Sequence, residues 1–164
     1  MSTSVVEQFA DHVDSLKVNG KIKAGQLDVG VWKEYTPAIT AVGGDPNLAN
    51  TQKRTARYMV IGKVLFWRFT YQSSGAGTAG SGAYDIDLPP GIVARQIDDT
   101  ETVGSAHIEN GGAISVGNVI LETPLSVNLL IGNDTTTPEN WGSARIPLST
   151  GALFVTASAT IEIN

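Results

Sequence analysis

Carboxylates at alternating positions are the first residues in this sequence that could do chemistry. Asp85 and Asp87 are two positions apart in a predicted strand, so they share one face, and an acidic loop supplies Asp98, Asp99 and Glu101. Grouped oxygens could bind Ca²⁺, and paired carboxylates could cleave a glycosidic bond. Neither group has the spacing of a calcium loop, so we expect the solvated face of an edge strand and predict no metal site.

A glycine-rich segment, residues 75–80 (GAGTAG), has the G-x-G-x-x-G form that cradles dinucleotide phosphates in some proteins. That chemistry needs a helix after the glycines, because N–H groups at a helix N-terminus hold the pyrophosphate. Residues 81–89 instead have the pattern of a strand closed by proline. We therefore predict a flexible loop between two strands and no nucleotide cofactor.

The sequence also offers little for nucleophilic catalysis or for binding nucleic acids. The two histidines, His12 and His107, have no nucleophile motif such as G-x-S-x-G nearby, and the absence of cysteine excludes thiolate chemistry. Basic and aromatic residues interleave at 63–71, but the aromatic rings are expected to face the core and cannot stack on bases. A net charge of −5 also argues against a nucleic-acid partner. We predict a protein that is not an enzyme.

The elements that must position these residues are strands. Only 16% of the residues are charged, and the many β-branched residues and 18 glycines are typical of strands joined by tight turns. Residues 64–72 and 153–163 alternate most clearly, and turn signals separate roughly ten short strands. Because no helices alternate with the strands, we predict an all-β fold, an antiparallel β-sandwich of the jelly-roll type.

The tryptophans allow a more specific expectation. Trp67 lies in the most regular of the alternating segments, on its apolar face, and should be buried. Trp141 follows the polar loop 134–140 and should be exposed or at a contact.

One stretch near the N-terminus is predicted to be a short helix. Ser4 and Glu7 have the spacing of a capping box. The apolar residues that follow at helical spacing are Val6, Phe9, Val13 and Leu16. An isolated helix of this length is marginal in water, so the stripe needs a partner surface. That surface is either the rest of its own domain or a seam shared between identical chains.

The chain divides at Gly30-Val31 in this interpretation. Residues 1–30 would form an anchor and oligomerisation segment, and residues 31–164 a β-sandwich head. No apolar run is long enough to span a bilayer, and the acidic N-terminus is unlike a secretory signal. We therefore expect a soluble protein that is made in the cytoplasm and does not insert into membranes.

The segment 31–90 resembles a domain that is common in structural proteins of tailed bacteriophages, at fibre tips and other surface projections. The residues that carry the resemblance are Trp32, Tyr35-Thr36-Pro37, Asp45-Pro46-Asn47-Leu48, Arg57-Tyr58, Ile61-Gly62-Lys63, Gly80-Ser81-Gly82, Tyr84 and Leu88-Pro89-Pro90. It covers a little over a third of the chain, and its specificity lies in the order and spacing of the pieces. Residues 91–164 share only the strand character.

The resemblance implies a jelly-roll-like head, assembled as a homotrimer, with a binding or structural role and no catalytic residues to carry over. Because a short anchor precedes one head, the sequence favours a capsid decoration or surface-spike protein that binds the capsid lattice. The alternatives are a tail-tip protein that binds a host-surface glycan and a hydrolase that acts on cell-surface polysaccharide. The expected location is the virion, after synthesis in the host cytoplasm, with capsid or tail proteins as partners.

Overall fold

The computed structural model describes residues 30–48, 51–74, 78–96, 98, 101–131, 139–142 and 152–164. These residues form ten β-strands and no helix, and all strand pairs are antiparallel. The prediction of an antiparallel all-β fold is confirmed. The predicted helix, with Val6, Phe9, Val13 and Leu16, lies outside the described residues.

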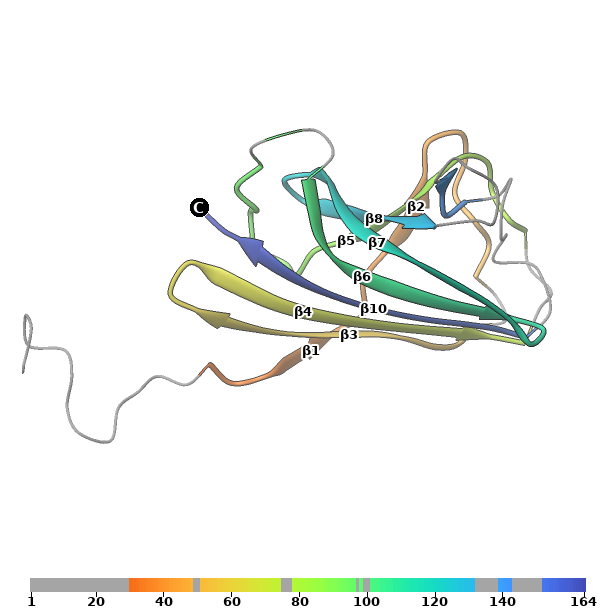
Figure 1. Cartoon of the computed structure of the whole chain (residues 1–164), viewed down its shortest axis with the longest axis horizontal. Helices are drawn as coiled ribbons and strands as arrows, with labels where there is room; N and C mark the ends of the chain where they lie inside the picture. The colour runs from red at the N-terminus through yellow and green to blue at the C-terminus, as the bar shows by residue number, and fades with distance from the viewer. Residues whose placement is uncertain are drawn as a thin grey trace, which may run out of the picture. The chain divides into compact units, whose positions relative to one another are not determined.

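The strands belong to one sheet with the order β1-β3-β4-β10-β6-β7-β8-β5-β2, and β9 pairs with β8 (Figure 1). Their bounds are β1 Lys33–Tyr35, β2 Ile39–Ala41, β3 Thr51–Ile61, β4 Val64–Ser73, β5 Tyr84–Asp87, β6 Glu101–Asn110, β7 Ala113–Thr123, β8 Ser126–Ile131, β9 Glu139–Asn140 and β10 Leu153–Glu162. The last long strand, β10, lies between β4 and β6, so the C-terminal segment closes the middle of the sheet. The jelly-roll assignment stays a prediction.

The two strands with the clearest alternation form as the sequence predicts. Along β4 the side chains of Leu65, Trp67, Phe69 and Tyr71 are buried, while the intervening positions are partly or fully exposed. Strand β10 has the same pattern over its whole length. The turn between β3 and β4 is tight because Gly62 has a φ of 59°, in the left-handed region that glycine adopts without strain.

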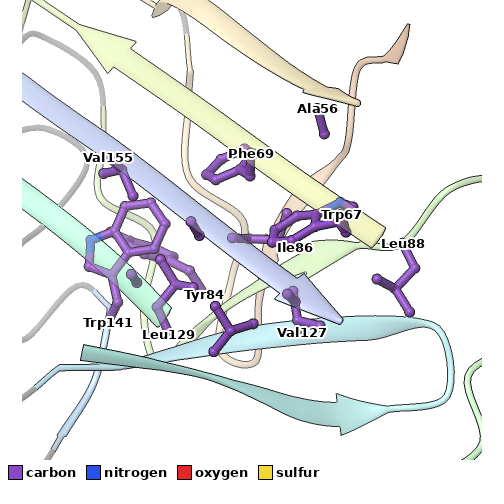
Figure 2. Close-up of a cluster of buried hydrophobic side chains, with 14 of the residues drawn as sticks. Ala56, Trp67, Phe69, Tyr84, Ile86, Leu88, Val127, Leu129, Trp141 and Val155 are labelled. Atoms are coloured by element: carbon purple, nitrogen blue, oxygen red, sulfur yellow. The ribbon is translucent and has the colours of Figure 1, made fainter. Parts of the chain in front are cut away.

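The core forms because the sheet curls and brings its two halves together. Side chains from β4 and β10 gather with side chains from β5 and β8 in one buried cluster (Figure 2). The sheet therefore has an inner face toward this core and an outer face on the other side. Below, "outer face" means the non-core side of β3, β4, β10, β6 and β7.

Trp141 belongs to this core, so the expectation that it is exposed or at a contact is wrong. Its side chain is 0% exposed and lies 5.0 Å from the ring of Tyr84, edge to face (Figure 2). The backbone explains this placement, because Trp141 N donates to Leu129 O and Trp141 O accepts from Tyr84 N. These two bonds hold the residue between β8 and β5, where its ring points into the core.

Candidate ligand-binding trough

Two rows of mostly polar side chains cross the outer face of the sheet. The first row follows the register of the strands and contains Glu34, Arg57, Arg68, Ser158, Ser105 and Asn118. The second contains Thr55, Thr70, Thr156, His107 and Val116. Adjacent strands are about 4.8 Å apart, so the first row, from β1 to β7, spans roughly 24 Å. The alternation that sends apolar residues into the core sends these residues outward.

The rows line a hollow on the outer face. One cavity of about 740 Å³ has both rows except Asn118 in its lining, and a second of about 350 Å³ lies beside Trp32, Phe66 and Thr160. Arg68, Ser105 and Ser158 line both cavities, so the two adjoin each other. We call this combined hollow the outer trough. The volume of each of the two cavities is in the range of small-ligand sites, and both are open to solvent.

A glycine lets the strands approach closely where the second cavity lies. Gly104 is at a register irregularity between β6 and β7. A Cβ atom at Gly104 would overlap the carbonyl oxygen of Ser158 on β10, so no other residue fits without a shift of the backbone. The close approach of β6 to β10 helps to place Ser105 beside Ser158 in the trough.

Trp32 stands at one end of the trough with two arginines over its ring. The guanidinium carbons of Arg57 and Arg68 are 5.3 Å and 5.6 Å from the ring centroid, within the range of a cation–π interaction. The indole is 38% exposed, so part of its surface is open to solvent. An exposed indole beside hydroxyl and guanidinium groups offers both apolar contact and hydrogen bonds to a ligand.

The core fixes Trp32 in place through β1. Trp67 Nε1 donates to the hydroxyl of Tyr35, which in turn donates to the backbone oxygen of Asp87; the two bonds are 2.7 Å and 2.8 Å long. Desolvation raises the pKa of Tyr35 far above its usual range, so the hydroxyl stays protonated and keeps its role as donor. Since β1 is short, these bonds and its pairing with β3 are what position Trp32.

The lining is positively charged although the chain as a whole carries −5. Lys53, Arg57 and Arg68 line the larger cavity together with a single carboxylate, Glu34, among the described residues. His107 also lies here, half-buried between Thr156 and Val116 in register. The arginines were not among the site residues predicted from the sequence. The signal that could have found Arg68 is the polar side of the alternation in residues 64–72.

The carboxylates that the sequence singled out lie elsewhere. Asp85 and Asp87 share one face of β5, as expected, but β5 lies between β8 and β2, so the predicted edge position is wrong. Asp85 is half-buried opposite Asn128, which is 1% exposed and whose side-chain amide interacts with the Asp85 carboxyl group. Asp98 is exposed, Glu101 begins β6, and Asp99 and His12 lie outside the described residues.

Burial gives Asp85 a pH-dependent effect on stability. Desolvation raises its pKa above the ordinary value; the hydrogen bond with the Asn128 side chain offsets part of this rise, and the charge of Asp87 adds to it. The folded state therefore binds this proton more tightly than the unfolded chain does. The stability that Asp85 contributes is fully present below about pH 4 and is lost as the pH rises through the raised pKa.

We predict that Asp85→Asn raises the melting temperature at pH 7, because the amide carries no charge to desolvate. The gain should shrink toward zero as the pH falls below about 4, where the wild-type carboxyl is protonated in both states. Thermal unfolding followed by circular dichroism between pH 3.5 and pH 7.5 measures this. Glu122→Gln removes an exposed carboxylate as a control, and an equal gain in that variant would contradict the assignment.

The described ranges contain neither a cluster of metal-binding side chains nor a membrane-spanning helix. No three His, Cys, Asp or Glu side chains there come close enough to hold a metal ion. Nor does that part of the chain contain a helix with the length and apolar character needed to cross a membrane.

Comparisons with known proteins give one structural likeness. No family model and no curated protein matches the sequence. The crystal structure of the Dettilon tailspike protein (gp208) matches with a TM-score of 0.55 and 16% sequence identity, over 82% of this chain and 24% of the tailspike chain. The present chain thus corresponds to about a quarter of that protein's length. At this identity the likeness shows that the two share a fold.

Proposed function

We propose that this protein is a non-enzymatic surface component of a bacteriophage virion and that it binds a host-surface carbohydrate in the outer trough. The trough is the observation that carries the proposal. It crosses the strands as an open hollow lined by hydroxyl and guanidinium groups, with an indole at one end. Such a surface suits an extended, hydroxyl-rich polymer. The fold shared with a tailspike protein supports the viral setting.

Binding without cleavage is the activity that this lining favours. Glycoside hydrolysis ordinarily uses two carboxyl groups on either side of the scissile bond. The described lining of the trough carries one carboxylate, Glu34, at its β1 end. Asp85 and Asp87 belong to β5, which is not among the strands of the outer face.

Blocking the trough tests this proposal. Ser105 is exposed and lines both cavities, so Ser105→Trp would place a bulky ring in the trough without disturbing the core. We expect the wild-type chain to bind a subset of an array of bacterial surface polysaccharides. The variant should lose at least about tenfold in affinity, equivalent to about 1.4 kcal/mol.

The control places the same ring elsewhere. Ala113 is an exposed residue of β7 that precedes Ile114 and therefore lies on the opposite face of the strand from the trough. The Ala113→Trp variant should bind polysaccharide with the same affinity as the wild type. Equal loss in both variants, or no binding of any polysaccharide by the wild-type chain, would count against the proposal.

A capsid decoration protein is the second candidate, and an apolar cluster on the outer face favours it. Ile114 and Val116 are 66% and 65% exposed, and Phe154 lies on the same face of β10. Ile114 and Val116 are neighbours on this face of β7, with Glu109 of β6 between Ile114 and Phe154, and exposed apolar side chains that adjoin are typical of protein contacts. In this proposal the chain is a homotrimer that binds the capsid lattice. Copy number separates the candidates, since a decoration protein should approach the abundance of the shell protein in purified particles.

A further inference from the structure

Two like charges lie directly opposite each other in the outer trough. Arg57 on β3 and Arg68 on β4 are register partners, so their side chains leave the sheet from adjacent points on the same face. Like charges in this position destabilise a pair of strands. Both guanidinium groups lie near the ring of Trp32, which offsets part of the repulsion.

The protein supplies little negative charge to this pair. Glu34 lies opposite Arg57 in register, but no ion pair within the described ranges joins Arg57 or Arg68 to a carboxylate. By contrast, Arg95 and Glu162 form an ion pair at 2.7 Å elsewhere on the surface. The arginines of the trough thus keep their hydrogen-bonding capacity for a ligand. Paired guanidinium groups suit a carboxylate, which accepts two parallel N–H bonds.

We infer that the outer trough binds an acidic polysaccharide, with a carboxylate of the polymer held at Arg57 and Arg68. This inference rests on the proposed function and specifies that the carbohydrate ligand is negatively charged. Lys53 extends the positive charge along β3. Beyond the arginines the first row continues with Ser158 and Ser105, which match sugar hydroxyls.

The distribution of charge favours a polysaccharide over a nucleic acid. Duplex DNA carries one negative charge per ~1.7 Å, and its binding needs many cations along its path. Here the arginines and Lys53 gather at the β3–β4 end of the trough, and its middle carries the hydroxyl groups of Ser158, Thr156 and Ser105 beside the imidazole of His107. A polymer with spaced carboxylates and many hydroxyl groups fits this arrangement of side chains across the strands. The net charge of −5 disfavours a dense polyanion.

The test compares polygalacturonate with its methyl ester, which has the same backbone without the charge. The full chain should bind polygalacturonate at least about tenfold more tightly than the ester, with an affinity that falls as salt increases. Arg57→Gln/Arg68→Gln should remove this preference. Lys33→Gln/Lys63→Gln is the matched control, since it also removes two positive charges from exposed positions, neither of which lines the trough.

A melting measurement shows that the arginine variant is folded. Because the like-charge pair is gone, it should melt at or above the wild-type temperature. Polygalacturonate should raise the melting temperature of the wild type and of the lysine control but not of the arginine variant.

The outcomes separate this inference from the proposed function. If the ester binds as tightly as polygalacturonate, or if the arginine variant binds polygalacturonate as tightly as the wild type, the inference of an acidic ligand is wrong. The proposed function would then stand with a neutral polysaccharide as the ligand. Tighter binding of duplex DNA than of polygalacturonate would also overturn it, in favour of a nucleic acid. If the chain binds neither the acid, the ester nor any polysaccharide on the array, both proposals fail.

Discussion

Trp67→Ala should destabilise the protein by about 4 kcal/mol, within the 3–5 kcal/mol range for removing a large aromatic side chain from a core. The indole is 1% exposed and stacks on Phe69, with ring centroids 5.8 Å apart. Truncation leaves a cavity between the two halves of the curled sheet (Figure 2). It also removes the hydrogen bond to Tyr35, leaving that hydroxyl without its donor.

Chemical denaturation with urea measures this loss, and Trp67→Phe separates its two parts. The phenyl ring keeps most of the packing but cannot donate to Tyr35, so this variant should lose only about 1–2 kcal/mol. Both substitutions loosen β1 and should weaken ligand binding at Trp32 as well. A loss below about 1 kcal/mol for Trp67→Ala would show that β4 does not pack as described.

Trp141→Ala should have an effect of similar size, about 3–5 kcal/mol, although the surrounding sequence is polar. The ring is 0% exposed and contacts both Tyr84 and Tyr71, at centroid distances of 5.0 Å and 6.4 Å. Aromatic pairs of this kind add to the burial of apolar area. The substitution therefore removes packing from β4 and β5 at once.

Trp32→Ala is the matched control for Trp141→Ala, since it removes the same side chain from a surface position. It should cost less than about 1 kcal/mol, because surface substitutions change stability little. Urea unfolding curves of both variants provide the comparison. If the free energy of unfolding of Trp141→Ala is within about half a kcal/mol of the wild-type value, residues 139–142 do not lie against the core.

The sequence by itself determined the class of fold and the orientation of side chains within the long strands. Alternation of apolar and polar residues depends only on the period of two along a strand, so β4 and β10 and their buried faces follow from local sequence. The turn at Gly62 follows from local chemistry too, because its backbone conformation is one that glycine favours.

Only the tertiary structure decided which strands are neighbours. The chain order does not place β10 between β4 and β6, or β5 inside the sheet, since pairing partners far apart in sequence leave no local signal. For the same reason the burial of Trp141 could not be predicted: hydrogen bonds to Leu129 and Tyr84 bring it to the core from beside a polar loop.

The candidate site combines both kinds of information. The outward positions of Arg68 and Ser158 could be predicted from alternation in their own strands. Their assembly with Arg57, Ser105 and Trp32 into one trough depends on the register of β3, β4, β10 and β6. Register is set by how the inner faces pack, because a slip of one residue would turn every core side chain outward. The packing of the core therefore decides which polar side chains meet on the opposite face.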